Sequence, residues 1–372
     1  MSLTALSLVP NFFLFALCPT FARAVSTPQP DIAGDWQLSW DDEFNTGTST
    51  DLAGWSYDLG NGSSQGITGW GNNEDEYYTN SSTNVNVANG DLNIVATPQT
   101  ITSSGYTTHY TSARIKTPSL FDQTYGVIEF RAELPAGKGL WPAVWMMPEN
   151  SSYGGWPTSG EIDMTEAQGS SPSFVQGSLH SGTSSNTEDN QTGYYEPSGF
   201  NPTTGFHTYD LVWTNGSPGS FKWYVDGHLY ETQTGGWVVP SGQASEAPFN
   251  QPFYLLINLA MGGNYGGSDS GSTGGTLAID YVRTYSNMLG DTNSDGVVNT
   301  TDLATITKNL GKKISGGYTV GDFNDDGYVN QDDLALYQLG LSEQSKLLYT
   351  APEPGMLAIG LAPLILWRRK RS

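Results

Sequence analysis

The stretch Val-Ile-Glu-Phe-Arg-Ala-Glu-Leu at residues 127–134 alternates with a period of two, and this period decides the fold. Successive side chains of a β-strand point to opposite faces, so the even-numbered residues from Ile128 to Leu134 share one face. That face is apolar throughout, whereas charged residues occupy most of the other. The stretch is therefore predicted to be a strand with one face against a hydrophobic core.

Further strands of the same kind are predicted between residues 31 and 286. Apolar and aromatic runs lie at 221–230, 254–259 and 278–285, and Gly- and Ser-rich loops separate them. Asp226-Gly227 in the first run is the signal of a tight turn between two antiparallel strands. No segment of this region predicts a helix longer than one or two turns. Many short strands over this length predict a two-sheet sandwich.

The composition agrees with an all-β fold and excludes several functions. The 372 residues include 45 glycines and 12 % aromatic residues but only 14 % charged ones, which disfavours a helical bundle or a coiled coil. With 15 Lys and Arg against 37 Asp and Glu, the net charge is −22, so nucleic acid is not an expected partner. A neutral ligand or a cation suits such a surface better.

The first 24 residues have the features of a secretory signal peptide. An uncharged apolar segment at 11–17 precedes Ala22-Arg23-Ala24, a cleavage site with small residues at both ends. The single cysteine, Cys18, lies inside this segment. The mature chain is therefore expected to be exported and to lack disulfides, thiol catalysis and zinc–thiolate sites.

Residues 351–372 combine three features at the C-terminus. Pro352-Glu353-Pro354 precedes an uncharged stretch at 355–367, and a basic cluster follows at 368–371. Basic residues directly after an apolar run favour the cytoplasmic side of a membrane. The combination resembles the PEP-CTERM sorting signal, which implies membrane retention and then removal by a sorting protease. The alternative is a disordered tail with an apolar patch that arose by chance.

Two loops between residues 290 and 342 repeat a pattern of oxygen side chains with an offset of 31 residues. In 291–302 and in 322–333, Asp or Asn stands at positions 1, 3, 5 and 12, and Gly stands at position 6. Ca²⁺ takes about six to eight oxygen ligands, and the Gly allows the sharp turn of the loop. Position 12 is Asp rather than the Glu of an EF-hand. Each loop leads into a short amphipathic helix, but no such helix precedes it.

The loop pair resembles a type I dockerin, the calcium-dependent module that docks onto cohesin domains. This resemblance implies a small α-helical module with two Ca²⁺ ions and a cohesin-type partner. The residues at positions 10 and 11 differ between the repeats, Thr300-Thr301 against Gln331-Asp332, so dual-mode binding is not expected. The implied calcium ligands are Asp291, Asn293, Asp295, Val297 and Asp302 in the first loop, and Asp322, Asn324, Asp326, Tyr328 and Asp333 in the second.

Three carboxylates lie within six residues in the segment Gly160-Glu161-Ile162-Asp163-Met164-Thr165-Glu166. In a regular strand Glu161 and Asp163 share a face, whereas Glu166 points to the other. A β-bulge around Met164-Thr165 would bring Glu166 onto the same face. Two such carboxyl groups can flank a glycosidic bond, with their pKa values pushed apart so that one stays protonated. The alternatives are an acidic edge strand and a set of calcium ligands.

Tryptophans flank the three carboxylates in the sequence. Trp141 and Trp145 lie in the segment 139–148, and Trp156 lies between Gly155 and Pro157. Indole faces stack on the apolar faces of sugar rings, so a cleft for a neutral polysaccharide needs several of them. We expect Trp141 and Trp156 in such a cleft and Trp145 in the core.

From about Trp36 to Tyr285 the chain closely resembles glycoside hydrolase family 16, in particular the laminarinase-like bacterial β-1,3-glucanases. The ordered blocks that carry the resemblance are 41–44, 70–74, 77–79, 141–146, 160–166, 177–180, 206–209, 224–227 and 258–263. The resemblance implies a jelly-roll sandwich of the concanavalin A type and a retaining mechanism. Glu161 would be the nucleophile, Glu166 the acid and then the base, and Asp163 would tune their protonation. Retention implies that the two Glu carboxyl groups lie about 5–5.5 Å apart.

The resemblance also assigns residues outside this segment. Those that match substrate-contacting positions are Asn72, Trp141, Trp156, His180 and Asn258, and a structural histidine is the alternative for His180. Those that match positions of a structural calcium on the convex face are Glu43, Gly90 and Asp280. His207 is expected to be structural, and Glu74 and Glu76 are expected to be loop carboxylates without a role.

The function implied by the resemblance is a secreted endo-β-1,3-glucanase that cleaves laminarin-like β-glucan and needs no cofactor for the chemistry. A mixed-linkage β-1,3-1,4-glucanase or an agarase of the same family is an alternative, because these enzymes share the bulged carboxylates. Sulfated glycans do not suit a surface this acidic. A non-catalytic β-glucan-binding surface protein is a further alternative, against which the intact Glu161 and Glu166 argue. The last alternative is a structural surface protein that functions through its dockerin-like module.

Overall fold

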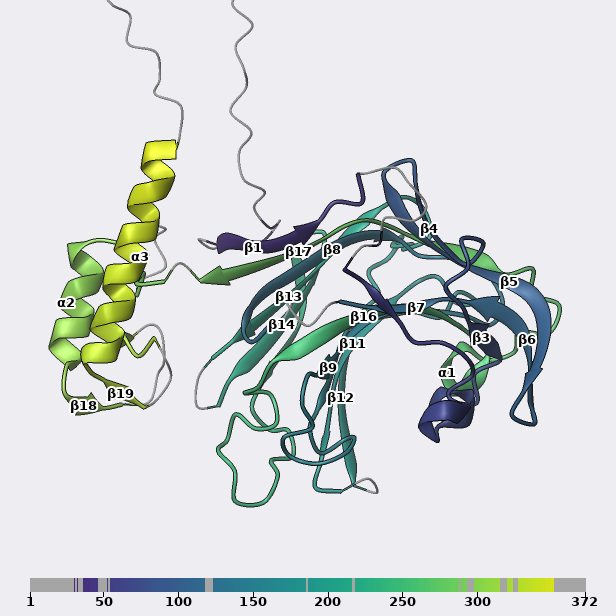
Figure 1. Cartoon of the computed structure of the whole chain (residues 1–372), viewed down its shortest axis with the longest axis horizontal. Helices are drawn as coiled ribbons and strands as arrows, with labels where there is room; N and C mark the ends of the chain where they lie inside the picture. Colours follow the sequence, from purple (N-terminus) through teal and green to yellow (C-terminus); the bar gives the residue numbers. More distant parts are fainter. Residues whose placement is uncertain are drawn as a thin grey trace, which may run out of the picture.

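The computed structural model contains two facing β-sheets and a small helical module beyond the end of one strand (Figure 1). It describes residues 30, 32, 36–45, 52, 54–117, 123–184, 187–215, 218–287, 289–292, 298–314, 320–323 and 327–350. The expected signal peptide at 1–24 and sorting segment at 351–372 lie outside the described residues. No described helix is both long enough and apolar enough to cross a membrane.

The larger sheet has ten strands and the smaller has seven, and almost all neighbours are antiparallel. The larger sheet runs in the order β15 (His228–Thr234), β14 (Ser220–Val225), β13 (His207–Thr214), β8 (Gly126–Glu133), β17 (Gly275–Asn287), β5 (Asp91–Ser103), β6 (Tyr106–Ser112) and β3 (Glu76–Tyr78), with β1 (Trp36–Asp42) on β17 and β4 (Val85–Ala88) on β5. The smaller sheet runs in the order β12 (Glu188–Tyr195), β11 (Val175–Gly182), β10 (Glu161–Glu166), β9 (Leu140–Pro148), β16 (Phe253–Met261), β7 (Arg114–Lys116) and β2 (Ser56–Tyr57). The helical turns η1 (Ser63–Gln65), η2 (Thr68–Gly71) and α1 (Gly263–Gly266) lie in the connections. The predicted all-β sandwich is confirmed.

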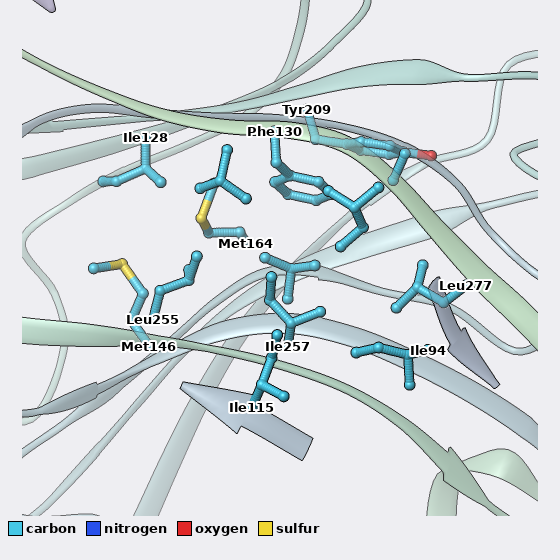
Figure 2. Close-up of a cluster of buried hydrophobic side chains, with 14 of the residues drawn as sticks. Ile94, Ile115, Ile128, Phe130, Met146, Met164, Tyr209, Leu255, Ile257 and Leu277 are labelled. Carbon is cyan, nitrogen blue, oxygen red and sulfur yellow. The ribbon is translucent and has the colours of Figure 1, made fainter. Parts of the chain in front are cut away.

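The hydrophobic core fills the space between the two sheets (Figure 2). Ile128 and Phe130 of β8 enter it from the larger sheet, and Met164 of β10 and Leu255 of β16 enter it from the smaller one. The apolar face of the 127–134 stretch is thus buried, as its period predicts. On the opposite face, Val127 belongs to a second buried cluster, so this strand is covered on both sides.

The predicted turn between β14 and β15 forms at Asp226-Gly227. Both residues have a positive φ, 49° and 72°, the conformation of the tight turn that matches the twist of a hairpin. The predicted strands at 254–259 and 278–285 lie within β16 and β17. The local patterns therefore located these strands correctly.

The C-terminal module packs α2 (Thr300–Asn309) beside α3 (Gln331–Thr350), and β18 (Lys312–Lys313) pairs with β19 (Tyr328–Val329). Its buried core consists of Val298, Ile306, Val329 and Tyr337. Asn299 and Asp302 form a capping box at the start of α2, which satisfies two backbone N–H groups. The second helix is longer than predicted and continues through Gly340. A Cβ at Gly340 would lie 1.6 Å from the carbonyl oxygen of Leu289, so glycine permits this close approach.

Candidate active site

A β-bulge in β10 places the three carboxylates on one face of the smaller sheet. Two residues separate Asp163 from Glu166, but their partners on β9, Trp145 and Ala143, are separated by only one residue. Met164 is the extra residue and lies in the core. Because Trp145 and Ala143 are two apart, they share a face, and so do Asp163 and Glu166. The predicted bulge is confirmed.

β10 lies in the interior of the seven-stranded sheet, so the alternative of an acidic edge strand is wrong. Side chains of the neighbouring strands extend the carboxylate face in three rows. These rows place His180 beside Glu161, Trp145 and Ser178 beside Asp163, and Asn258, Ala143, Gln176 and Tyr194 in line with Glu166.

Indole N–H groups hold the two outer carboxylates. Trp156 donates from Nε1 to Oε2 of Glu161 at 2.6 Å, and Trp141 donates from Nε1 to Oε1 of Glu166 at 2.9 Å. Trp156 is 43 % exposed, so its ring can contact a ligand while its N–H fixes the carboxylate. The structure thus places both expected cleft tryptophans directly at the carboxylates.

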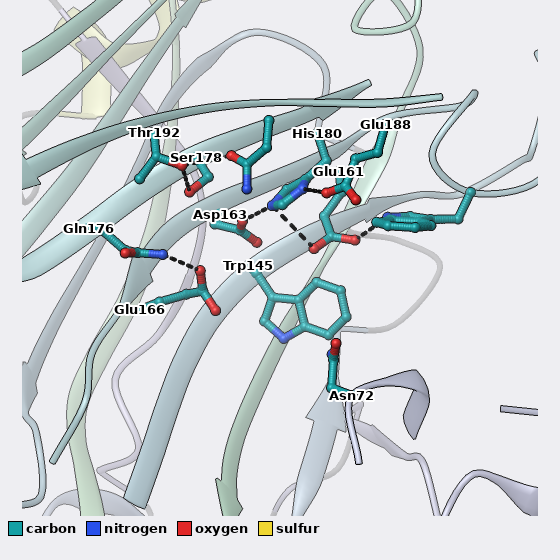
Figure 3. Close-up of polar contacts among 12 residues, drawn as sticks. Asn72, Trp145, Glu161, Asp163, Glu166, Gln176, Ser178, His180, Glu188 and Thr192 are labelled. Carbon is teal, nitrogen blue, oxygen red and sulfur yellow. Dashed lines mark hydrogen bonds and ion pairs between the residues drawn. The ribbon is translucent and has the colours of Figure 1, made fainter. Parts of the chain in front are cut away.

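Glu166 has a second donor and is suited to hold a proton. Gln176 donates from Nε2 to Oε2 of Glu166 at 3.0 Å (Figure 3). Burial raises the pKa of Glu166, although the hydrogen bonds from Gln176 and Trp141 oppose this shift. A carboxyl group with a raised pKa can carry the proton that a general acid must donate near neutral pH.

Asp163 and His180 share a proton between the two glutamates. Nε2 of His180 lies 2.8 Å from Oδ2 of Asp163, and Nδ1 lies 2.7 Å from Oε1 of Glu188 (Figure 3). Burial alone would lower the pKa of His180, but the charges of Asp163 and Glu161 outweigh it and raise the pKa to about 11. Burial and the charge of Glu166 raise the pKa of Asp163 well above its usual value. Both shifts keep a proton in the Asp163–His180 hydrogen bond at neutral pH.

On the same face lies a cluster of three side chains whose ligand atoms are close enough together to hold a metal ion. One ligand atom each from Glu161, Asp163 and His180 lie within 4.8 Å of one another. A metal needs the imidazole nitrogen without its proton, whereas the carboxylates around His180 retain that proton. Ca²⁺ also prefers oxygen ligands. The arrangement therefore fits proton chemistry better than a calcium site.

The prediction that Trp145 lies in the core is wrong. Its cross-strand partner is Asp163, so its ring lies on the carboxylate face, where Nε1 donates to Oδ1 of Asn258 at 2.7 Å. The guanidinium of Arg114 lies 4.7 Å from the ring centroid. Trp141 and Trp145 are four residues apart in one strand. The period of two that puts Trp141 on the carboxylate face therefore puts Trp145 there as well.

Asn72 and Asn258 are both expected to contact substrate. Asn72 lies on the Trp145 side of the face (Figure 3), and Asn258 accepts the hydrogen bond from Trp145. Nδ2 of Asn258 donates to the hydroxyl of Tyr78 at 3.1 Å. Nδ2 of Asn72 donates to Oε1 of Glu74 at 3.4 Å. The hydrogen bonds to Tyr78 and Glu74 therefore fix the orientation of both amide groups.

The prediction that Glu74 and Glu76 are loop carboxylates is wrong. Glu74 is 5 % exposed and pairs with Gly262 in an isolated β-bridge, and Glu76 is 0 % exposed and begins β3. A single sequence could not show that a segment so rich in polar residues is buried, because the strands that cover it come from elsewhere in the chain.

Sequence reasoning also missed Gln176 and Glu188, which contact Glu166 and His180. For Gln176 a signal was present, because positions 176, 178 and 180 share a face in a strand and His180 was already a candidate. Glu188 offered no such signal. It reaches His180 only because β12 pairs with β11. His207, in contrast, bonds Asp226 at the β14–β15 turn, as expected of a structural histidine.

The residues expected at a structural calcium have other partners. Glu43 accepts hydrogen bonds of 2.7 and 2.9 Å from Nε and Nη2 of Arg283, and Asp280 is paired with Arg131. Gly90 has φ 92° in the turn between β4 and β5. The calcium site at Glu43, Gly90 and Asp280 stays a prediction.

Half of the expected calcium ligands of the C-terminal module belong to the described residues. Asp291, Asp302, Asp322 and Asp333 are at most 3 % exposed, and Tyr328 is 47 % exposed. Burial of four carboxylates in so small a module is costly without a compensating charge, and a divalent cation would supply it. The remaining ligands, Asn293, Asp295, Val297, Asn324 and Asp326, lie outside the described residues.

Known proteins resemble this chain in both parts. Residues 72–283 match the family model of the glycosyl hydrolases family 16, and residues 289–341 match the dockerin type I domain. Glucan endo-1,3-beta-glucosidase A1 of Niallia circulans is 39 % identical over 70 % of this chain, which spans 39 % of that protein's length. The glucan endo-1,3-beta-glucosidase of Cryptopygus antarcticus is 38 % identical over 67 % of this chain and 92 % of that protein.

A solved structure agrees with the sandwich as well. The laminarinase catalytic domain from Thermotoga maritima MSB8 superposes with a TM-score of 0.60 at 38 % identity, covering 68 % of this chain and 99 % of that one. The expected jelly-roll class is therefore confirmed for the sandwich.

Proposed function

Because the chain belongs to family 16 of the glycosyl hydrolases, we propose that it is an exported, retaining endo-β-1,3-glucanase that acts on laminarin-like β-glucans. The observation that carries the proposal is the bulged row of Glu161, Asp163 and Glu166, whose outer members are each fixed by an indole N–H. The relatives, two glucan endo-1,3-beta-glucosidases and a laminarinase, support the β-1,3 linkage.

In the first step, an oxygen of Glu161 attacks the anomeric carbon while Glu166 gives its proton to the glycosidic oxygen. The bond between these two substrate atoms breaks, the departing chain leaves as an alcohol, and a glycosyl ester on Glu161 remains. In the second step, Glu166 takes a proton from water, and the water oxygen attacks the same carbon. Glu161 is released as a carboxylate, and the product keeps the original anomeric configuration.

Asp163 acts as a positioning residue between the two glutamates. Its proton-sharing bond to His180 reduces the negative charge that Glu161 and Glu166 experience. Glu166 can then lose its proton in the first step without leaving three adjacent unshielded charges. Trp156 holds Glu161 for the attack, and Trp141 and Gln176 orient Glu166 toward the glycosidic oxygen.

The mixed-linkage glucanase and agarase alternatives use the same row of carboxylates. Only the polysaccharide that the enzyme cleaves therefore distinguishes these activities. Digests of laminarin, lichenan and agarose are compared by product chromatography, and the anomeric configuration of the first product is followed by NMR. We expect laminari-oligosaccharides as the main products, formed first as the β-anomer. Preferential cleavage of lichenan or agarose, or an α-anomer, would contradict the proposal, and binding without cleavage would favour the glucan-binding alternative.

We further propose that residues 31–286 form the catalytic domain and residues 290–342 a dockerin module with two Ca²⁺ ions that docks onto a cohesin-type partner. Dockerin type I domains bind calcium, and the four buried aspartates fit this property. Residues 1–24 would direct export, and residues 351–372 would hold the protein at the membrane until a sorting protease removes them. Truncation after Tyr285 separates the roles, because an enzyme keeps its activity and a surface protein that works through the module does not.

A further inference from the structure

A chain of hydrogen bonds leads from the carboxylate face to buried carboxyl groups that the proposed mechanism does not use. Trp145 bonds Asn258 at 2.7 Å, Asn258 bonds the hydroxyl of Tyr78 at 3.1 Å, and that hydroxyl donates to Oε2 of Glu74 at 3.3 Å. Asn72 reaches Oε1 of the same Glu74 at 3.4 Å. Two expected substrate contacts and the central tryptophan therefore all depend on one carboxylate.

Glu76 lies next to Glu74 and is the neutral member of the pair. Its Oε2 accepts the backbone N–H of Met261 at 2.7 Å, whereas no donor among the described residues reaches its buried Oε1, and the carboxyl is under the influence of Glu74. Two carboxyl groups can form a hydrogen bond only if one of them carries a proton. Asn72 and Tyr78 donate to Glu74, whereas no described donor reaches Oε1 of Glu76, so the proton is assigned to Glu76. Burial and the charge of Glu74 also raise the pKa of Glu76 well above its usual value.

Glu74 is the ionised member, because donors and a cation surround it. Burial raises its pKa, but the bond from Glu76, the charge of Arg114 on β7 and the bonds from Asn72 and Tyr78 all lower it. The guanidinium of Arg114 lies between the rings of Trp70 and Trp145, 4.6 and 4.7 Å from their centroids.

Two further titratable groups complete the surroundings of the pair. On β6, the hydroxyl of Tyr106 donates to the backbone oxygen of Glu74 at 3.1 Å. The neighbouring Asp75 points elsewhere and pairs with His109. Arg114 is thus the cation whose charge lowers the pKa of Glu74.

We propose that Glu74 and Glu76 form a proton-sharing pair that positions Asn72, Asn258 and Trp145 for the sugar chain, with Glu76 as the acid and Glu74 as the carboxylate. This inference rests on the proposed function and adds the groups that hold its binding face. The pair is not catalytic, since it reaches the substrate only through other side chains. Its loss should therefore weaken substrate binding more than it slows the chemical step.

The decisive experiment makes the same chemical change at each member. A Gln at position 76 can still donate to Glu74 and accept from Met261, whereas a Gln at position 74 removes the charge that Arg114 faces. We expect Glu74→Gln to raise KM for laminari-oligosaccharides by about tenfold or more, as for loss of hydrogen bonds to a charged group, with a smaller change in kcat. Glu76→Gln should raise KM much less at pH 6.

The pH dependence supplies a readout that a merely structural pair would not give. In the wild type, KM should rise at alkaline pH as Glu76 loses its proton and repels Glu74, and Glu76→Gln should remove this rise. The raised pKa means that the wild type binds more protons when folded, so its stability falls relative to Glu76→Gln as the pH increases above the ordinary carboxyl range.

Glu129→Gln is the control, because Glu129 is 1 % exposed and lies near Arg283 and Tyr285 in the central strands of the larger sheet, not in the sheet that carries the catalytic carboxylates. It should lower the melting temperature but leave KM unchanged. Equal increases in KM for Glu74→Gln and Glu76→Gln, or a Glu76→Gln variant as sensitive to pH as the wild type, would overturn the proposal. A wild type without activity on any β-glucan would instead refute the proposed function.

Discussion

Carboxylates are concentrated in both parts of this chain, but the sandwich and the C-terminal module hold them differently. On the carboxylate face of the sandwich, hydrogen-bond donors of the protein itself surround Glu161, Asp163 and Glu166. They are two indole N–H groups, one amide and one imidazole. In the module, four aspartates of the two loops are buried in the pattern of calcium ligands. Backbone N–H groups also donate to Asp302 and Asp333, but the oxygen pattern of the two loops suits the module to a metal ion as well.

This difference explains how a chain of net charge −22 can use its carboxylates for two purposes. A carboxylate held by hydrogen bonds keeps lone pairs that can attack a carbon or accept a proton. A carboxylate bound to Ca²⁺ is committed to stabilising the fold, and the metal's binding energy becomes folding energy. The two parts should therefore respond separately to loss of a carboxylate and to loss of calcium.

The largest effect is expected from substitution of the nucleophile in the sandwich. Glu161→Gln should lower kcat on laminarin by more than about 10³-fold, as expected when an essential nucleophile is removed. Binding of laminari-oligosaccharides, measured by calorimetry, should persist because the stacking and amide contacts remain. Residual hydrolysis within tenfold of the wild type would show that the row of carboxylates is not the catalytic centre.

Removal of calcium should affect the module and spare the sandwich. We expect EGTA to abolish the separate unfolding transition of α2 and α3 in calorimetry, since binding at 100 times Kd contributes about 2.7 kcal/mol. Hydrolysis of laminarin should change by less than about twofold, because no step of the chemistry uses the metal. Added Ca²⁺ should restore the transition, whereas a module transition that is unaffected by EGTA would refute the calcium assignment.

His180 allows a test of how hydrogen bonds alone stabilise the cleft. Its pKa of about 11 in the folded protein exceeds the value near 6.5 of an unfolded histidine. Its contribution to stability is therefore complete below about pH 6.5 and is lost as the pH rises through 11. Compared with His180→Gln, the wild type should be more stable by about 1–3 kcal/mol at pH 6, as for a hydrogen bond to a charged group.

Urea denaturation at pH 6, 8 and 10 measures this difference, which should shrink at each step. His109→Gln serves as the control, since His109 is also paired with an aspartate but its side chain is 61 % exposed. A difference for His180→Gln that is constant with pH would contradict the shared proton.

The sequence located several of the strands and the bulge because both follow from the local period of two. Three carboxylates in Glu161–Glu166 can share a face only with an extra residue, and the structure has it at Met164. Residues positioned by pairing between distant strands were harder to predict. Glu188 meets His180 through β12, and Glu74 is covered by β16, so no local pattern shows either contact. The error at Trp145 had another cause. The strand period of two, counted from Trp141, already placed Trp145 on the same face, but it was not applied to this residue.

The smallest effect is expected from a change in the hydrogen bonds that tune Glu166. Gln176→Leu removes a donor that favours the ionised carboxyl, so the already raised pKa of Glu166 should rise further. Since Glu166 must be protonated in the first step, the alkaline limb of the kcat profile should move to higher pH, and the maximum of kcat should fall by less than about tenfold. Gln191→Leu, on the neighbouring strand β12 and not bonded to a carboxylate of the row, is the control and should leave the limb in place. A limb that moves to lower pH, or not at all, would show that the hydrogen bond from Gln176 does not set the proton affinity of Glu166. The contrast with the aspartates of the module that are expected to bind calcium would then have to rest on burial alone.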